Sequence, residues 1–130
     1  MRVVLAIGGS GRGLALTVRS LLQAQAEGVA REIRAGRPLP PLYRTGIRYK
    51  PEPQRGQGTE YFDDPWTVLA RGHGDCDDLV VYRCGELLAA GEPASVICAW
   101  RWPRLHVAVR RADGRAEDPS KILIRKFGRL

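Results

Sequence analysis

The chain has 130 residues, 44% hydrophobic and 27% charged, which suits one packed domain over residues 1–130 and excludes a disordered chain. No apolar run approaches the roughly 20 residues of a transmembrane helix, and no signal peptide is visible, so we expect a protein that is cytoplasmic on synthesis. The 21 Lys and Arg residues outnumber 14 Asp and Glu residues but are spread from Arg2 to Arg129, which argues against a specific nucleic-acid site.

The first two predicted elements are a strand and a long helix. Residues 2–7 are β-branched and apolar enough for a buried strand, which a glycine cluster ends. This cluster lacks the spacing of a phosphate-binding loop, so we expect a plain turn. Apolar residues then recur every three or four positions from Leu14 to about Ala35, which predicts a helix. Gly28 is its weak point, because glycine costs a helix up to about 1 kcal/mol relative to alanine.

Residues 36–65 predict an ordered but irregular crossing of the surface. They hold six of the nine prolines, and between these Tyr43 to Tyr49 could form a short strand. A loop of this length is usually functional or a linker. Because it leads directly toward a cysteine-containing segment, we interpret it as one wall of a substrate groove.

A helix is predicted to begin at Cys76. Asp75 is a good N-cap residue, and the carboxylates of Asp77 and Asp78 suit the positive end of a helix. Apolar residues continue on one helical stripe until Gly91 and Pro93 end it.

The position of Cys76 in the first turn favours a nucleophile. Unsatisfied N–H groups and the helix dipole are expected to lower the pKa of its thiol and to receive an oxyanion. A half-buried cysteine of a capping turn is the structural alternative. Cys84 and Cys98 lie in apolar segments, and three cysteines without close pairs predict neither a disulfide framework nor a zinc site. We expect no metal and no other cofactor.

Three strands are predicted after this helix, at residues 94–100, 105–110 and 115–118, with a turn at Asp113 and Gly114. In the second strand, alternation places His106 on the face opposite the bulky apolar side chains. The turn returns Asp118 toward His106. Cys76, His106 and Asp118 then supply a thiol, a base and a carboxylate that orients the base.

The hairpin register tests the role of Asp118. A tight two-residue turn would pair Val109 with Asp118 and would place Asp118 on the opposite face from His106. We therefore predict a wider connection of about five residues, 110–114, or a bulge that restores the parity.

Four motifs follow one another from residue 66 to residue 121. They are Gly74-Asp75-Cys76-Asp77-Asp78, Gly91-Glu92-Pro93-Ala94, Leu105-His106-Val107-Ala108-Val109 and Glu117-Asp118-Pro119-Ser120. Together they resemble the transglutaminase-like superfamily, which has a papain-like core, and their joint occurrence is more specific than any one of them. The Arg-Pro-Leu-Pro-Pro-Leu-Tyr lead-in is also similar to small members encoded by tailed phages and prophages.

The resemblance implies a nucleophile at Cys76, a general base at His106 and an orienting acid at Asp118. We expect an α+β fold whose central helix carries the cysteine and packs on an antiparallel sheet carrying the histidine and aspartate. An N-terminal part (1–65), a catalytic core (66–121) and a basic tail (122–130) would make up the domain. The expected activity is that of a peptidase or amidase acting through a thioester, with acyl transfer to an amine also open.

Other residues are weaker candidates for the same site. In related enzymes an indole N–H often completes the oxyanion hole, which suggests Trp66, with Gln54 behind it, although a core role for Trp66 is the stronger interpretation. His73 is a competing histidine three residues before Cys76, and we expect it to lie in the turn, out of reach of the thiol.

A rival interpretation is a structural or assembly component of a phage particle that keeps the fold with little or no catalysis. The expected partners are a peptide or amide substrate or, in the rival case, other phage structural proteins. The basic surface would then be solvated or would bind an acidic partner.

Overall fold

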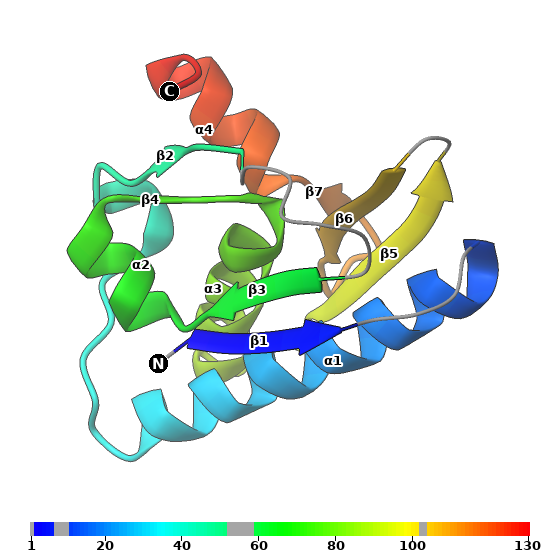
Figure 1. The fold of residues 1–130 in the computed structure, drawn as a ribbon. Helices are drawn as coiled ribbons and strands as arrows, with labels where there is room; N and C mark the ends of the chain where they lie inside the picture. Colours follow the sequence, from blue (N-terminus) through cyan, green and yellow to red (C-terminus); the bar gives the residue numbers. More distant parts are fainter. Residues whose placement is uncertain (1, 7–10, 52–58, 102–103) are drawn as a thin grey trace.

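A computed structural model describes residues 2–6, 11–51, 59–101 and 104–130 of the chain (Figure 1). These residues form four α-helices, a three-stranded antiparallel sheet, a two-stranded antiparallel pairing and a short parallel pairing. The predicted α+β class is confirmed. Across the described ranges, no helix has both the length and the apolar character needed to span a bilayer.

The N-terminal strand and helix form where the sequence predicts them. Strand β1 spans Arg2–Ala6 and helix α1 spans Gly11–Arg34. β1 pairs antiparallel with β3 (Thr59–Asp63), so that Arg2 lies opposite Asp63. The irregular course predicted for 36–65 is therefore wrong over β3, because this strand depends on a partner far away in the sequence.

The described residues 36–51 of the proline-rich segment are largely irregular, as predicted. A short 3₁₀ helix, η1 (Leu42–Arg44), precedes the two-residue strand β2 (Arg48–Tyr49). β2 pairs in parallel with β4 (His73–Gly74), which lies immediately before the cysteine helix.

Helix α2 (Pro65–Arg71) was not predicted. Asp64 accepts a hydrogen bond from the backbone N–H of Thr67, and Pro65 occupies the first helical position, where its missing N–H is no loss. Gly72 ends the helix with a positive φ of 86°, a conformation that glycine adopts without strain.

Helix α3 spans Cys76–Ala89 and begins where the sequence predicts. Asp75 and Asp78 form a reciprocal capping box, in which each carboxylate accepts a hydrogen bond from the other residue's backbone N–H. Gly91 has a φ of 92° just beyond the helix, so the predicted stop is confirmed.

The antiparallel sheet consists of β5 (Ser95–Arg101), β6 (Arg104–Arg110) and β7 (Ala116–Glu117). β5 and β6 pair from Ser95↔Arg110 onward, and β6 pairs with β7 at Val109↔Glu117 and Arg110↔Ala116. The β6–β7 connection therefore contains five residues, 111–115. The predicted wide connection is confirmed, one residue later than expected.

Residues Pro119–Phe127 form helix α4, so the segment 122–130, expected as a basic tail, is helical over most of its length. Asp118 caps this helix and Pro119 occupies its first turn, the same combination that opens α2. Leu123 anchors α4 because its side chain is fully buried.

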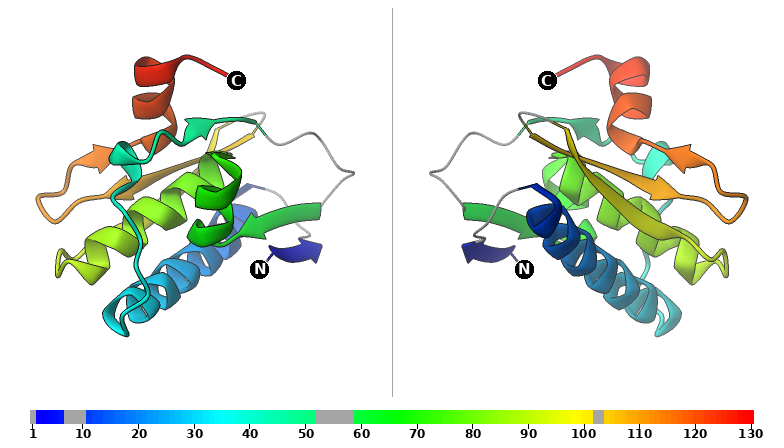
Figure 2. Two further views of the ribbon diagram at one scale, coloured as in Figure 1. Left: turned by 90° about the vertical axis from the view of Figure 1, so that its left-hand side faces the viewer. Right: turned by 90° about the vertical axis from the view of Figure 1, so that its right-hand side faces the viewer.

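Two hydrophobic clusters meet at α3. The first, which we call the α1 cluster, joins α1 and α3 to β5 and β6, and Figure 2 shows both helices on one side of these strands. The second, the α4 cluster, joins η1, α2 and α4 to α3. Its buried members are Leu42, Ile47, Val68, Leu79, Tyr82 and Leu123.

Candidate active site

His106 and Asp118 lie together, as the sequence predicts. The Nε2 atom of His106 is 3.2 Å from the Oδ2 atom of Asp118, and the imidazole is partly exposed. This pairing leaves Nδ1 of His106 as the ring nitrogen that could act on another group. An imidazole oriented through one nitrogen by a carboxylate is the arrangement of a general base.

The sheet register explains why these two residues meet. The pairing of Val109 with Glu117, continued by one residue in each direction, places Asp118 opposite Ala108. Ala108 and His106 are two residues apart on one strand, so they share a face. The five-residue connection therefore places Asp118 on the same face of the sheet as His106, whereas a two-residue turn would have placed it on the opposite face.

Asp118 also holds the start of α4. Its Oδ1 atom accepts a hydrogen bond of 3.2 Å from the backbone N–H of Lys121, while Oδ2 faces the imidazole. The helix cap thus restricts the carboxylate to the orientation that meets His106.

Cys76 is the first residue of α3 and is half-buried against the α1 cluster. Its Sγ atom lies 3.8 Å from Oδ1 of Asp77. Burial, together with the carboxylates of Asp77 and Asp75, raises the pKa of the thiol well above its ordinary value, against the contribution of the Asp77 backbone N–H. The expected lowering of this pKa is therefore wrong, because burial disfavours the thiolate and the acidic residues that suit the helix end also repel it.

The structure does not join all three candidate residues directly. Within the described residues, no hydrogen bond connects the Cys76 thiol to the His106 imidazole. The face of α3 that carries Cys76 can nevertheless be traced. Arg83 is seven residues further along, which is two helical turns, so both residues lie on the same side of α3.

That side of α3 faces the strand leading to Asp118. The Nε atom of Arg83 donates a hydrogen bond of 2.7 Å to Glu117, and Tyr43 donates one of 2.6 Å to the same carboxylate. Arg111, in the β6–β7 connection, donates a hydrogen bond of 2.7 Å to the other oxygen of the same carboxylate. Glu117 immediately precedes Asp118, so these contacts hold the Arg83 turn of α3, two turns beyond Cys76, against the end of β7.

A buried network of charges supports the start of α3, and sequence reasoning missed it. Arg71, at the end of α2, lies 2.6 Å from a carboxylate oxygen of Asp63 and 3.2 Å from one of Asp78. Both carboxylates are buried, and burial with the neighbouring Asp75 raises the pKa of Asp78 to about 8. The density of Asp residues around one arginine in 63–78 is the sequence signal that could have found it.

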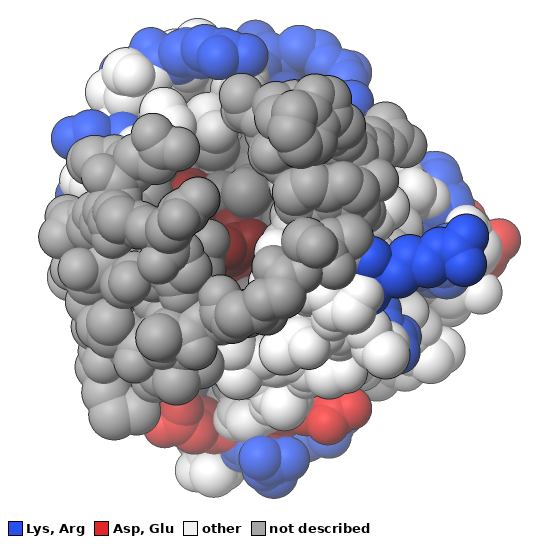
Figure 3. Space-filling model, turned by 45° about the vertical axis from the view of Figure 1, so that its right-hand side comes forward, with Lys and Arg blue, Asp and Glu red and all other residues white. Residues whose placement is uncertain are grey.

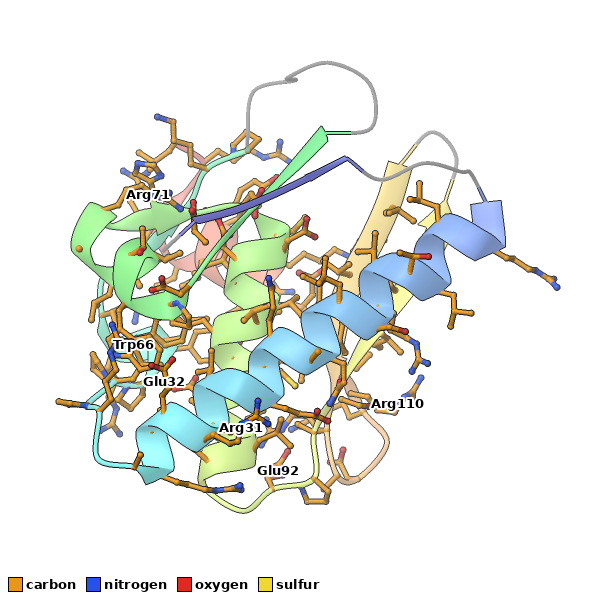
Figure 4. All side chains as sticks on the ribbon, turned by 60° about the horizontal axis from the view of Figure 1, so that its bottom comes forward. Arg31, Glu32, Trp66, Arg71, Glu92 and Arg110 are labelled. Atoms are coloured by element: carbon orange, nitrogen blue, oxygen red, sulfur yellow. The ribbon has the colours of Figure 1, made fainter. Side chains whose placement is uncertain are left out.

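The weaker candidates have other surroundings. The indole N–H of Trp66 donates a hydrogen bond of 2.7 Å to the carbonyl of Pro38, and the Arg37 guanidinium stacks 3.7 Å above the ring centre. Figure 4 shows Trp66 on the side of α2 that faces the end of α1. In this structure the indole donor is therefore already engaged. Gln54 lies outside the described residues.

His73 belongs to β4 and not to a turn. Burial and the cations of Arg71 and Lys50 lower the pKa of its imidazole. Among the described contacts, none links His73 to Cys76, so His106 remains the better candidate for the base.

A cavity of about 540 Å³ opens between α1 and the junction of β3 with α2. Its lining includes Gln25, Val29, Glu32, Asp63, Pro65 and Val81. Within the described part of the chain, Cys76, His106 and Asp118 do not line it, so it is separate from the candidate site.

No protein-family model matches the chain, and neither a curated protein nor a solved structure matches it significantly. The case for a function therefore depends on the residues and their geometry.

Proposed function

We propose that the protein is a cysteine hydrolase of transglutaminase-like type that cleaves an amide bond through a thioester at Cys76. The contact between His106 and Asp118 is the observation that carries the proposal. It orients an imidazole on the strand next to a helix that begins with a cysteine. The four ordered sequence motifs add support, and the Arg-Pro-Leu-Pro-Pro-Leu-Tyr lead-in suggests small phage-encoded members of the superfamily as relatives.

The chemistry would begin with a neutral thiol. Because the thiol pKa is raised, a base must remove the proton as sulfur attacks, and Nδ1 of His106 is the available base. The sulfur–carbon bond forms, and the carbonyl oxygen takes the negative charge beside the backbone N–H groups that open α3. His106 then returns the proton to the leaving amine as the carbon–nitrogen bond breaks.

The resulting thioester would be hydrolysed in the second half of the reaction. His106 takes a proton from a water molecule, whose oxygen bonds to the acyl carbon, and the carbon–sulfur bond then breaks. The products are a carboxylic acid and the regenerated thiol. An amine in place of water would give acyl transfer by the same steps.

Labelling with a peptidyl chloroacetamide tests the proposal. We expect the label on Cys76 in the wild-type protein and about 100-fold slower labelling in His106→Ala, which removes the base. Cys98→Ala is the matched control, because Cys98 also borders the α1 cluster but belongs to β5. Labelling that is equally fast in His106→Ala and wild type would contradict the assignment of His106.

A second candidate function is that of a structural or assembly component that keeps the fold but catalyses no reaction. The raised thiol pKa and the lack of a described hydrogen bond between Cys76 and His106 favour it. It predicts that Cys76 reacts no faster than a buried thiol and that Cys76→Ala retains every function of the protein. Hydrolysis of a peptide or amide substrate that disappears in Cys76→Ala would contradict this alternative.

A further inference from the structure

Two segments of the chain carry many cations and no acidic side chain. Two segments, 43–50 and 119–130, contain seven cations and no Asp or Glu. The other residues of the chain hold 14 cations and 14 acids, so their formal charge is zero. The formal charge of these two segments therefore equals the net charge of the chain, +7. Their cations are Arg44, Arg48, Lys50, Lys121, Arg125, Lys126 and Arg129.

The two segments form one surface, which we call the basic face. Helix α4 packs against β2. Arg48 donates a hydrogen bond of 2.9 Å to the carbonyl of Phe127, and Lys126 donates one of 2.7 Å to the carbonyl of Tyr43. In Figure 3, Lys and Arg side chains gather along the top of the molecule, where α4 and β2 lie in Figure 1. The fold thus collects cations that are dispersed in the sequence.

The cations of the basic face are available to a partner. All of them except Arg48 are exposed. Among the described residues, none of the seven forms an ion pair with a carboxylate, whereas Arg71, Arg83 and Arg111 all do. Positive charge gathered without internal compensation attracts polyanions.

We propose that the basic face binds the phosphate backbone of nucleic acid without sequence preference. A protein–protein interface normally has an apolar centre, yet the exposed large hydrophobic side chains of this face are Phe127 and Leu130, both near the C-terminal end. A row of cations on a helix instead matches the repeating charge of a phosphate chain. The proposal goes beyond the hydrolase function and does not depend on it.

The test measures binding of the full-length protein to a fluorescein-labelled 20-base-pair DNA duplex by anisotropy between 50 and 200 mM NaCl. If about four phosphates are contacted, the affinity should fall on the order of 100-fold over this range. Arg125→Gln/Arg129→Gln should weaken binding about tenfold or more and should flatten the salt dependence by roughly two units of slope. Arg125 lies in α4, where glutamine has nearly the same helix propensity as arginine, and Arg129 lies beyond the end of the helix. Thermal unfolding checks that the variant remains folded.

The matched control is Arg12→Gln/Arg19→Gln, which removes the same charge from exposed positions on α1. We expect this control to bind DNA as the wild type does, within about twofold. Equal losses in both double variants would overturn the basic face as the site. Tighter binding of polyglutamate than of DNA would overturn the choice of nucleic acid and assign the face to an acidic protein, and no binding at 50 mM NaCl would overturn the proposal entirely.

Discussion

The two oxygens of Asp118 have different partners, so its two roles can be separated. Oδ1 caps α4, and Oδ2 meets the imidazole of His106. Asparagine caps helices about as well as aspartate does, but it brings no charge to orient the base or stabilise its protonated form.

Asp118→Asn should therefore leave the free energy of unfolding within about 0.5 kcal/mol of the wild-type value. The same variant should slow the labelling of Cys76 about tenfold or more. Asp118→Ala should lose both roles, with a destabilisation of about 1 kcal/mol. Urea unfolding and labelling rates measured on the same samples check both effects. If Cys76 is labelled at the wild-type rate in Asp118→Asn, the role of Asp118 is limited to capping α4.

The free energy of unfolding should depend on pH through the carboxyl group of Asp78. Its pKa in the folded protein is about 8, above the ordinary 3.8, because it is buried beside Asp75. The folded state then holds a proton that the unfolded state releases between these values, so this group's contribution to stability falls as the pH rises from about 4 to about 8. Asp78→Asn should lack this dependence.

Urea unfolding of both proteins at pH 5, 6.5 and 8 gives the comparison. The stability of wild type relative to Asp78→Asn should decrease across the series. An increase would mean that Arg71, which contacts both Asp63 and Asp78, keeps the Asp78 carboxylate ionised against burial.

At the scale of elements, α1 and α3 pack closely at Gly85. A methyl group there would lie 2.6 Å from Cγ1 of Val29 and 3.2 Å from the carbonyl oxygen of Ala26. Gly85→Ala should therefore separate the helices and destabilise the protein by about 1–3 kcal/mol.

Gly28 is the matched control, because it lies on α1 with no atom closer than 3.7 Å to an added methyl group. Gly28→Ala should stabilise the protein by up to about 1 kcal/mol through helix propensity alone. Chemical unfolding of both variants compares the two glycines. Equal effects at Gly85 and Gly28 would show that α1 and α3 pack less closely than described.

The elements that the sequence predicted are those with local signals. Helix periodicity and the Asp75 cap located α1 and α3, and alternation located β5 and β6. β3 was missed because its stability comes from pairing with β1, more than 50 residues away. The short helices α2 and α4 were missed although each opens with Asp-Pro, a local signal of a cap and a first turn.

The candidate site was predictable to a similar extent. The position of Cys76 and the side of β6 that carries His106 follow from residue patterns, and the required parity predicted the wide connection to Asp118. The thiol pKa was not predictable from the helix end alone, since it depends on burial and on two nearby carboxylates. The bridge from Arg71 to Asp63 and Asp78 is likewise a product of tertiary packing.

The whole molecule is organised around α3, which both clusters share. Leu22 is fully buried in the α1 cluster and Leu123 in the α4 cluster. Because each cluster needs the same helix, neither should survive the loss of the other, and unfolding should be a single transition.

Leu22→Ala and Leu123→Ala should each destabilise the protein by about 2–5 kcal/mol and should preserve one cooperative transition. Far-UV circular dichroism and tryptophan fluorescence, followed together through urea unfolding, check this. Two separate midpoints in either variant would show that the clusters unfold independently.

The basic face also has a colloidal consequence. The other residues sum to zero formal charge, so the +7 of this surface contributes strongly to the mutual repulsion between copies of the protein near neutral pH. A polyanion that covers the surface would cancel that repulsion and bring the molecule to the zero net charge at which proteins associate most readily. Occupation of one face could thus turn a dispersed protein into one that coats or condenses the polymer it binds.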